Sequence, residues 1–376
     1  MNLPRILLSS LLIAIAGGCA TSAPPTPAAP PPRSVSVLEP AWEAQIRKAR
    51  AVLAPRIATH PAVAVAVAID GRIVWSEANG WADVASQREA KSSTRFRLYS
   101  TAKALTGTLA LRLEQAGRLD LDTAIGTYLP DLPSHLQKLM MRQLLGHLGG
   151  VRHYRDGEWM KVSSSRCTNA RDALSQFADD PLVAGPGTEY AYSSFGFVLA
   201  SAVIEAAGGA SFTDLLYAEI LGPAEMTGTG VDTPAAHDDN TSSFYWEGQR
   251  GRVVEAPVID NSCKFGAGGI LTTVDDLARF GVALLDRQLV DSSGIDVLFS
   301  PQTTSAGANT GYSLGWGVSE DGSWIGHSGG SPGGRSYLLV DRRHRVVIAV
   351  LSNFEGEGLS EEVAKIREIF IPAESR

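Results

Sequence analysis

Strand-like segments stand at both ends of the globular sequence, and helix-like segments stand between them. Residues 62–69 read AVAVAVAI, an alternation typical of a strand, and Asp70-Gly71 predicts a tight hairpin turn after it. Residues 335–354 contain two further strand-like runs separated by turn residues, whereas the apolar spacing over about 116–264 is mostly helical. We therefore expect an α+β fold: one antiparallel sheet built from the N- and C-terminal segments and flanked by helices, with an inserted all-α region.

Three helices help to set the boundaries of these parts. Apolar residues at helical spacing predict helices over 42–57, 101–116 and 360–370. The sheet part should comprise about residues 41–115 and 265–376, and the inserted helical part should lie between them. No internal repeat is visible.

Composition excludes several classes of protein. Of the 376 residues, 44% are hydrophobic and 19% are charged, which is too apolar for a disordered chain. A formal net charge of -7 argues against a nucleic-acid partner, because such proteins usually carry a basic excess. Three cysteines are too few for a disulfide scaffold or a zinc ribbon, and whether Cys167 and Cys263 pair is open at this point.

The first 19 residues have the layout of a secretory signal. Arg5 is followed by an apolar run over 6–15 that is too short to span a membrane, and then by small residues before Cys19. One interpretation is an ordinary signal peptide with an incidental cysteine. The other is a resemblance to a bacterial lipobox, which implies that Cys19 carries a lipid anchor. Because Ala20 and not Asp follows, that resemblance points to the periplasmic side of the outer membrane.

A proline-rich stretch separates this signal from the globular sequence. Six prolines fall between Pro24 and Pro32, a density that favours an extended polyproline II spacer. The expected organisation is a signal peptide over 1–19, a linker over 20–40 and one domain over 41–376.

Ser100 and Lys103 form the only S-x-x-K in the chain. The serine lies where a loop enters a helix, and a spacing of three places both side chains on one helix face. A lysine within reach of a serine hydroxyl at a helix N-terminus suits a nucleophile with an adjacent base. The simpler interpretation is a helix-capping serine followed by a surface lysine.

Tyr192 and Ser194 form a second candidate motif, Tyr-x-Ser, ahead of an apolar helix. A tyrosine near a lysine can have its pKa lowered from about 10, because a positive charge favours the phenolate. The alternative is a half-buried tyrosine that packs against the helix.

Residues 326–330, Gly-His-Ser-Gly-Gly, form the third motif, on or just after a strand. Glycines allow a ligand to approach the backbone closely. The segment also spells G-x-S-x-G, the nucleophile elbow of α/β-hydrolases, with Ser328 as nucleophile. That interpretation needs a helix after the serine, whereas strand patterns follow it here.

The order of the three motifs resembles that of the serine β-lactamases and penicillin-binding proteins. The similarity covers about residues 42–355 and is greatest to the branch of class C β-lactamases, esterases and D-aminopeptidases. It is carried further by RQLLGHLGGVRHY at 142–154, by PGTEYAYSSFGFVLASAVIE at 186–205 and by GAGGILTTVDDLARF at 266–280. Within the branch, H-L-x-G-V-R-H-Y and Y-S-S-F-G-F are similar to the serine β-lactamase-like group of mitochondria and bacteria.

The resemblance implies a role for each motif. Ser100 attacks a carbonyl and becomes acylated, while Lys103 and Tyr192 handle the proton, with the resting base left open. The backbone N–H groups of Ser100 and Gly330 form the oxyanion hole.

Further residues are implied in substrate binding by their positions in these motifs. His327 and Ser328 orient the substrate carbonyl or carboxylate from an edge strand. The other implied contacts are Ser194, Gly329 and Tyr154.

Two departures from the family pattern bear on the substrate. Ser194 stands where the motif usually has an asparagine that grips a substrate amide. His327 stands where efficient β-lactamases have a lysine, and a histidine is mostly neutral at pH 7. We therefore expect a serine hydrolase that acts through an acyl-enzyme on amide or ester bonds, peptidase- or esterase-like, with weak or no β-lactamase activity.

Two alternatives remain, and few other residues suggest chemistry. The alternatives are an idle binding or scaffolding protein on the same fold, and an esterase that uses Ser328. His147 and His153 are not at a metal-ligand spacing, so they are interpreted as loop and packing residues, and no metal or cofactor is expected. Cys263-Lys264 is expected near the mouth of the cleft. The expected partners are a small-molecule or peptide substrate and, through Cys19, a membrane.

Overall fold

The computed structural model describes residues 31–371, which belong to one compact unit. The predicted signal peptide, Cys19 and most of the predicted linker lie outside the described residues.

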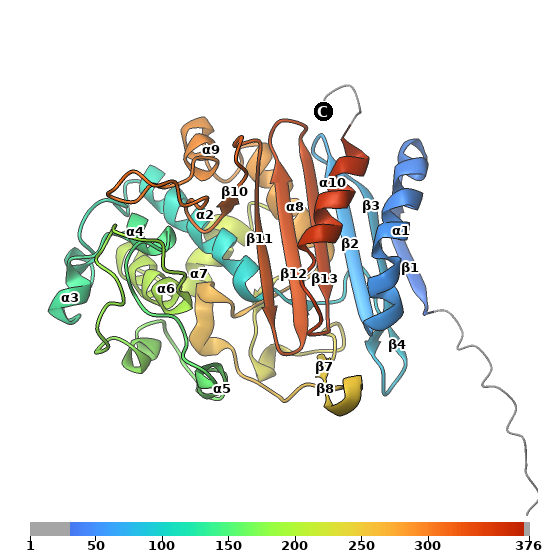
Figure 1. The fold of residues 1–376 in the computed structure, drawn as a ribbon, viewed down its shortest axis with the longest axis horizontal. Coiled ribbons are helices and arrows are strands. Elements are labelled where there is room, and N and C mark those ends of the chain that lie inside the picture. Colours follow the sequence, from blue (N-terminus) through green and yellow to red (C-terminus); the bar gives the residue numbers. More distant parts are fainter. Residues whose placement is uncertain (1–30, 372–376) are drawn as a thin grey trace, which may run out of the picture. The chain divides into compact units, whose positions relative to one another are not determined.

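An antiparallel sheet joins the two ends of the globular chain, as the sequence predicted (Figure 1). β2 pairs with β13, so that Val65 lies opposite Val350 although 285 positions (350 − 65) separate them. The strands, in spatial order, are β1 (Arg33–Leu38), β3 (Arg72–Asp83), β2 (Ala62–Ile69), β13 (Val346–Ser352), β12 (Gly334–Asp341), β11 (Trp324–Ser331) and β10 (Gly317–Val318), with β4 (Arg88–Glu89) paired to β3.

The predicted linker is wrong at its C-terminal end. Arg33–Leu38 is strand β1, which pairs antiparallel with β3. Val35 and Val37 alternate with polar residues, a pattern that suits a solvent-facing edge strand. The proline-rich composition ends at Pro32, and from Arg33 the chain has the backbone donors that a ladder needs.

The alternation in β2 gives its two faces different side chains. The valines Val63, Val65 and Val67 pack against helices α1 (Glu43–Thr59) and α10 (Ser360–Phe370). The alanines at 62, 64, 66 and 68 face the other way, toward α8 (Val274–Leu285), which lies behind the sheet in Figure 1. Small side chains let a helix approach the sheet closely. The alternation of valine and alanine along β2 therefore sets how far the helices lie from each face of the sheet.

The inserted region is less helical than predicted. Its longest helix is α6 (Ser194–Gly208). The helical spacing of MRQLLGHL at 141–148 and of ARDALSQFADD at 170–180 predicts two further helices, but both segments make only single short turns. Gly146 and the left-handed His147 end the first of these after five residues. The remaining elements are α3 (Ser134–Gln137), α4 (Met141–Leu145), α5 (Glu158–Val162), α7 (Phe212–Leu216), α9 (Ser292–Leu298), a small sheet of β5 (Phe96–Arg97), β9 (Ile270–Thr272) and β6 (Gly230–Val231), and the hairpin of β7 (Tyr245–Glu247) and β8 (Val253–Glu255).

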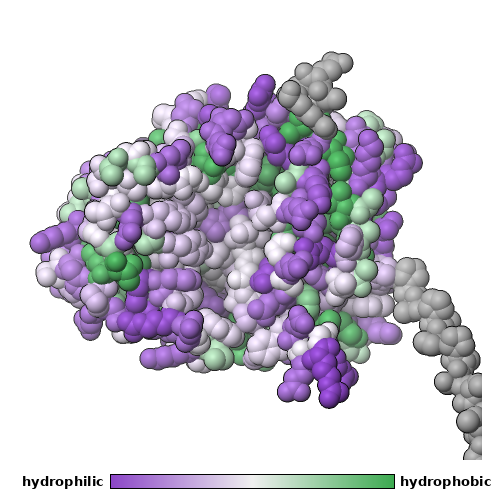
Figure 2. Space-filling model, viewed as in Figure 1, coloured by the Kyte–Doolittle hydropathy of each residue, from purple (hydrophilic) through white to green (hydrophobic). Residues whose placement is uncertain are grey.

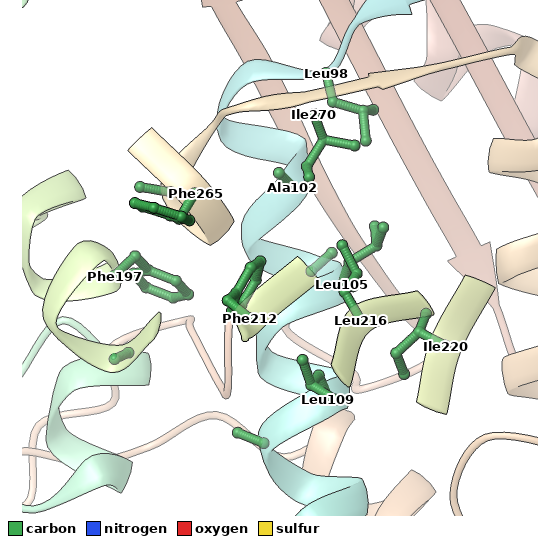
Figure 3. Close-up of a cluster of buried hydrophobic side chains, with 14 of the residues drawn as sticks. Leu98, Ala102, Leu105, Leu109, Phe197, Phe212, Leu216, Ile220, Phe265 and Ile270 are labelled. Carbon is green, nitrogen blue, oxygen red and sulfur yellow. The ribbon is translucent and has the colours of Figure 1, made fainter. Parts of the chain in front are cut away.

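Helix α2 (Ala102–Gln115) runs through the centre of the molecule, and nearly all of its residues are buried. Leu105 and Leu109 pack with Phe212 and Leu216 from the inserted region, while Ala102 lies close to Ile270 of the small sheet (Figure 3). A helix buried on all sides is held by the whole core, so its first turn offers a rigid support for a functional group.

A disulfide and a polar surface complete the globular part. Cys167 and Cys263 are bonded, which settles the question that the sequence left open.

On the face shown in Figure 2, hydrophilic side chains predominate and hydrophobic ones form small separate patches. Among residues 31–371, no single helix is long and apolar enough to cross a membrane; α6 passes such a test only together with residues 212–221, beyond a bend of 80°, and it lies in the core.

Candidate active site

Ser100 lies in a short 3₁₀ turn, Tyr99–Thr101, that leads directly into α2. Tyr99 has a left-handed backbone with φ of 47°, which turns the chain sharply between β5 and the helix. Thr101 fixes the turn to the edge of the sheet, because its Oγ1 donates to the backbone oxygen of His327 and lies 2.8 Å from Ser336 Oγ. The Ser100 side chain is half-buried and reaches a cavity.

Lys103 is completely buried and makes three polar contacts. Its Nζ lies 3.1 Å from Ser100 Oγ, 3.2 Å from Ser194 Oγ and 2.7 Å from the backbone oxygen of Ala267. Among residues 31–371, no carboxylate forms an ion pair with Lys103 or shifts its pKa. Burial without a counter-ion lowers the pKa of Lys103 to about 7, so a large fraction of the side chain is a neutral amine at neutral pH.

Tyr192 donates its phenolic hydrogen to Ser100 Oγ over 2.8 Å. Its pKa is raised to about 12 by burial, opposite to the lowering that the sequence suggested. That expectation required a fixed positive charge beside the phenol. Lys103 does not supply one, because the same burial that disfavours a phenolate also disfavours the ammonium.

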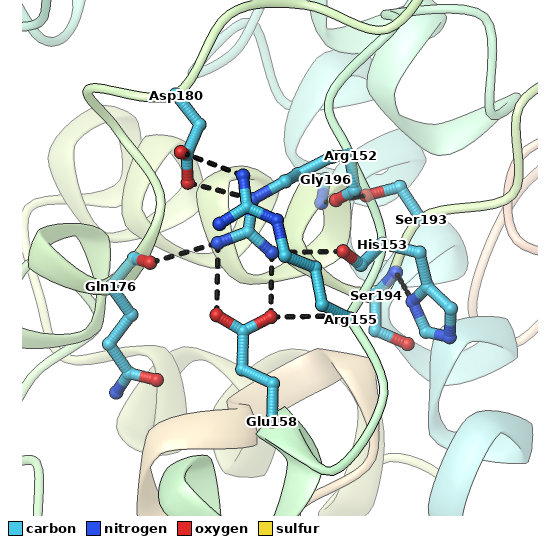
Figure 4. Close-up of polar contacts among 9 residues, drawn as sticks. All are labelled: Arg152, His153, Arg155, Glu158, Gln176, Asp180, Ser193, Ser194 and Gly196. Carbon is cyan, nitrogen blue, oxygen red and sulfur yellow. Dashed lines mark hydrogen bonds and ion pairs between the residues drawn. The ribbon is translucent and has the colours of Figure 1, made fainter.

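Two histidines hold the segment that carries Tyr192 and Ser194. His147 Nδ1 accepts the backbone N–H of Ser193, and His153 Nδ1 accepts that of Ser194, each over 3.1 Å. Ser193 Oγ caps α6 by accepting the backbone N–H of Gly196. The same hydroxyl donates to the backbone oxygen of Arg152 (Figure 4). The two histidines therefore hold the tyrosine motif in position. The sequence interpretation of them as loop and packing residues described their location but not these hydrogen bonds.

The loop that bears His153 is fixed by charge. The guanidinium of Arg152 is 7% exposed and forms ion pairs of 2.7 Å with both Glu158 and Asp180 (Figure 4). A guanidinium paired with two carboxylates sets a well-defined geometry for the loop between Gly150 and α5. This loop forms one wall of the cavity beside Ser100.

That cavity has a volume of about 390 Å³. Of the predicted site residues, Ser100, Ser194, Tyr154 and Gly330 line it. The other lining residues were not predicted as site residues: Tyr99, His153, Arg155, Asp156, Gly157, Trp159, Lys264, Ala267, Gly268 and Ser331.

Strand β11 passes close to Ser100, and glycine makes this approach possible. A Cβ on Gly329 would lie 2.1 Å from the backbone oxygen of Leu98 and 3.1 Å from the Ser100 nitrogen. Gly329 therefore allows β11 to lie against the turn that carries Ser100, and it has no side chain that could contact a substrate. Its neighbour Gly330 lines the cavity.

The α/β-hydrolase alternative is wrong for this fold. Ser328 is exposed within β11, and the chain continues through a short turn into β12. A nucleophile elbow requires a strand, then the serine, then a helix.

His327 does not lie where the resemblance implied. It is 8% exposed and absent from the cavity wall; its Nε2 lies 2.9 Å from the hydroxyl of Tyr312, and its Nδ1 contacts the backbone oxygen of Ser328. Side chains alternate along a strand, so when Ser328 faces outward His327 faces inward. Burial and the nearby Lys103 lower the pKa of His327 to about 3, which keeps the ring neutral.

Two of the cavity residues had only weak signals in the sequence. Lys264 was expected near the cleft mouth because it precedes a glycine-rich run, but without a role. His153 was interpreted as packing, and its nearness to Ser194 follows from a contact across 41 positions that no local pattern encodes.

The chain is similar to several known proteins in sequence and in fold. The family model described as Beta-lactamase matches residues 49–370. The human mitochondrial serine beta-lactamase-like protein LACTB is 26% identical, over 81% of this chain and 76% of that protein. Penicillin-binding protein 4* of Bacillus subtilis is also 26% identical, over 77% and 68%. Among solved structures, FmtA from Staphylococcus aureus superposes with a TM-score of 0.76 at 18% identity, over 89% of this chain and 88% of that one.

The family match covers most of the chain, and the solved structure named above shares the fold found here. The chain therefore belongs to the Beta-lactamase family, as a serine hydrolase of the β-lactamase/DD-peptidase type that acts through an acyl-enzyme.

Proposed function

We propose that Ser100 is the nucleophile, that Lys103 is its resting base and that Tyr192 is the proton donor to the leaving group. One observation carries the proposal: Ser100 Oγ lies 3.1 Å from Lys103 Nζ and 2.8 Å from the Tyr192 hydroxyl, beside the cavity. A nucleophile in contact with both a base and an acid has the two partners that acyl transfer needs.

The three contacts of Lys103 suit a neutral amine. Such a group has two N–H bonds and one lone pair. The backbone oxygen of Ala267 and Ser194 Oγ accept two N–H bonds. In the ammonium form the third N–H is donated to Ser100 Oγ over 3.1 Å, and in the neutral form the lone pair takes its place and can accept the Ser100 hydroxyl hydrogen. Ser194 thus orients the base, in addition to lining the cavity.

The proton steps follow from these assignments. As Ser100 Oγ attacks the carbonyl, its proton moves to Lys103. Tyr192, still protonated because burial raises its pKa, gives its proton to the departing nitrogen or oxygen. Transfer of the Lys103 proton back to Tyr192 restores the site, and water then releases the acyl group by the same steps in reverse order.

The N–H groups of Ser100 and Gly330 are proposed as the oxyanion hole. Both residues line the cavity, at the helix entrance and on β11. Removing one donor from such a site costs about 3–4 kcal/mol at the transition state.

The substrate class is an amide or ester of the peptidase or esterase kind, with weak or no turnover of β-lactams. Ser194 offers one short hydroxyl and is engaged by Lys103. His327 is neutral and buried, so the third motif brings no positive charge to the cavity.

Covalent labelling tests the proposal. A fluorophosphonate should label Ser100, and the adduct, located by peptide mapping, should be lost in Ser100→Ala but kept in the matched variant Ser328→Ala. An adduct on Ser328, or none with any acylating reagent, would overturn it; the second result would favour an idle binding protein. A penicillin should form an adduct slowly or not at all.

We further propose that the protein is exported and anchored through lipidated Cys19 to the outer membrane. The signal-like composition of residues 1–19 supports this, as does the Cys167–Cys263 disulfide, because such bonds persist in oxidising compartments. Cys19→Ala should move the protein from the membrane fraction to the soluble fraction of bacterial cells. An unchanged distribution would contradict the anchor.

A further inference from the structure

Lys264 is a second lysine at the cavity, and the proposed mechanism does not use it. It lies in the 3₁₀ segment Ser262–Ala267, the same segment whose Ala267 oxygen holds Lys103. Its side chain lines the cavity together with Ser100 and Gly330, yet the residue is only 4% exposed.

The ammonium of Lys264 has no hydrogen-bond acceptor and no ion-pair partner in the part of the chain that the structure describes. No hydrogen bond or ion pair involves its Nζ, which lies over the ring of Tyr99, 5.7 Å from the ring centroid. Asp232 is the nearby carboxylate, but Arg97, His237 and Asn261 already bind its oxygens.

Burial is the main cause that lowers the pKa of Lys264 to about 7. The nearby Asp232 favours the ammonium, and Arg97 and Lys103 have the opposite, smaller effects. A buried ammonium without an acceptor is costly, so such groups are normally paired. A ligand that enters the cavity can supply the missing acceptor.

The backbone that presents Lys264 is held in place on both sides. Cys263, its neighbour, is bonded to Cys167 in the loop after α5. Phe265, on the other side, has a left-handed φ of 40°, and Gly266 packs so closely on α2 that a Cβ there would lie 2.1 Å from Thr106 Oγ1. The lysine is therefore displayed by a constrained segment and not by a free surface loop.

We propose that Lys264 binds a carboxylate on the acyl donor, so that this hydrolase prefers substrates carrying a single negative charge near the scissile bond. The inference rests on the proposed function, since it places the substrate in the cavity beside Ser100. A single ammonium matches a monoanion better than a dianion such as a phosphate monoester, because Arg155, the other cationic side chain on the cavity wall, is already paired with Asp180.

A matched pair of esters tests the preference. p-Nitrophenyl butyrate and p-nitrophenyl hemisuccinate share a leaving group and have acyl chains of similar size, but only the hemisuccinate ends in a carboxylate. The wild-type protein should show the higher kcat/KM for the hemisuccinate. Lys264→Met should lower that value by about 10- to 100-fold, the range for a charged hydrogen bond, while butyrate changes little.

Two control variants separate charge from structure. Lys264→Arg should keep most of the preference, because guanidinium retains the charge. Lys48→Met, a neutralisation on the exposed surface of α1, should change neither substrate. Equal losses for both esters in Lys264→Met, or no preference in the wild type, would overturn the inference.

The pH dependence gives a readout that a structural role would not produce. Above about pH 7, kcat/KM for the hemisuccinate should fall as the Lys264 ammonium loses its proton, and the butyrate value should not. In Lys264→Arg the falling limb should disappear. A falling limb of equal size for both esters would contradict the assignment.

Failure of the inference and failure of the proposed function are distinguishable. If Ser100→Ala abolishes turnover of both esters but Lys264→Met leaves the preference intact, only the Lys264 assignment fails. If Ser100→Ala retains turnover, the nucleophile itself is wrong.

Discussion

Among the single residues, the central feature is a lysine without a counter-ion next to a serine. Lys103 is buried among neutral acceptors, and this alone lowers its pKa to about 7. Tyr192 is shifted in the opposite direction by the same burial. The environment thus separates a base that is partly neutral from an acid that keeps its proton.

The first prediction concerns pH. For a neutral ester, kcat/KM should rise with pH up to about 7 and then level off, because the neutral fraction of Lys103 rises as its ammonium loses a proton. His153 and His327 have pKa values lowered to about 4 and 3, so they are neutral throughout this range. A pH–rate profile between pH 5 and pH 10 checks this; a midpoint near the ordinary lysine pKa of about 10.4 would contradict it.

The three motifs could be read from the sequence, but their environments could not. The S-x-x-K spacing placed Lys103 near Ser100 because both lie on one helix turn. The direction of the Tyr192 pKa shift, the inward position of His327 and the lack of a partner for Lys264 depend on contacts between distant segments. Local patterns carry no information about such contacts.

Among the helices and strands, the site depends on how closely β11 approaches the turn before α2. Gly329 permits the approach, since any Cβ there would collide with the backbone of Leu98. The same reasoning applies to the 3₁₀ segment Ser262–Ala267, whose Gly266 lies against α2. Two glycines thus set the positions of Gly330 and Lys264 relative to Ser100.

The second prediction tests this packing. Gly329→Ala should destabilise the protein by about 1–3 kcal/mol, the usual cost of overpacking. It should also lower kcat while KM changes less, because the added methyl group would move β11 away from Ser100. Urea denaturation and steady-state kinetics measure the two effects. Gly358→Ala is the matched control, because a Cβ there meets nothing within 4 Å. Wild-type activity in Gly329→Ala would show that the approach is not required.

The third prediction concerns the disulfide. Replacing both Cys167 and Cys263 with serine should cost about 2–5 kcal/mol of unfolding free energy, because the bond closes a loop across a sequence separation of 96. It should also weaken the preference for the anionic ester, since Cys263 holds the segment of Lys264. Denaturation of the variant against the oxidised parent checks the first part. An unchanged midpoint would mean that the bond does not constrain the unfolded chain.

In the globular part taken together, the two ends of the chain form one sheet around an inserted region. The alternation in β2, the hairpin after it and the strands near the C-terminus were enough to predict this arrangement. The edge strand β1 was missed because its pairing partner, β3, stabilises a segment that follows a proline-rich stretch. The short helical turns of the inserted region were overestimated, because tertiary packing and left-handed residues end them early.

The fourth prediction follows from this topology. Backbone amides of β2 and β13 should exchange with solvent only through global unfolding, because these strands are central and buried on both faces. Amides of the edge strand β1 should exchange faster, through local opening. Hydrogen–deuterium exchange with peptide resolution measures both. Equal protection of β1 and β2 would contradict the expected order.

Acylation of Ser100 by substrate is the step on which the proposed mechanism depends, and rapid-quench mass spectrometry observes it. The protein is mixed with p-nitrophenyl butyrate, quenched in acid within a turnover, and its intact mass and peptides are measured. We predict a single butyryl group on the peptide containing Ser100, absent from Ser100→Ala. A butyryl group on another residue, or turnover of the ester with no acylated protein at any quench time, would contradict the mechanism.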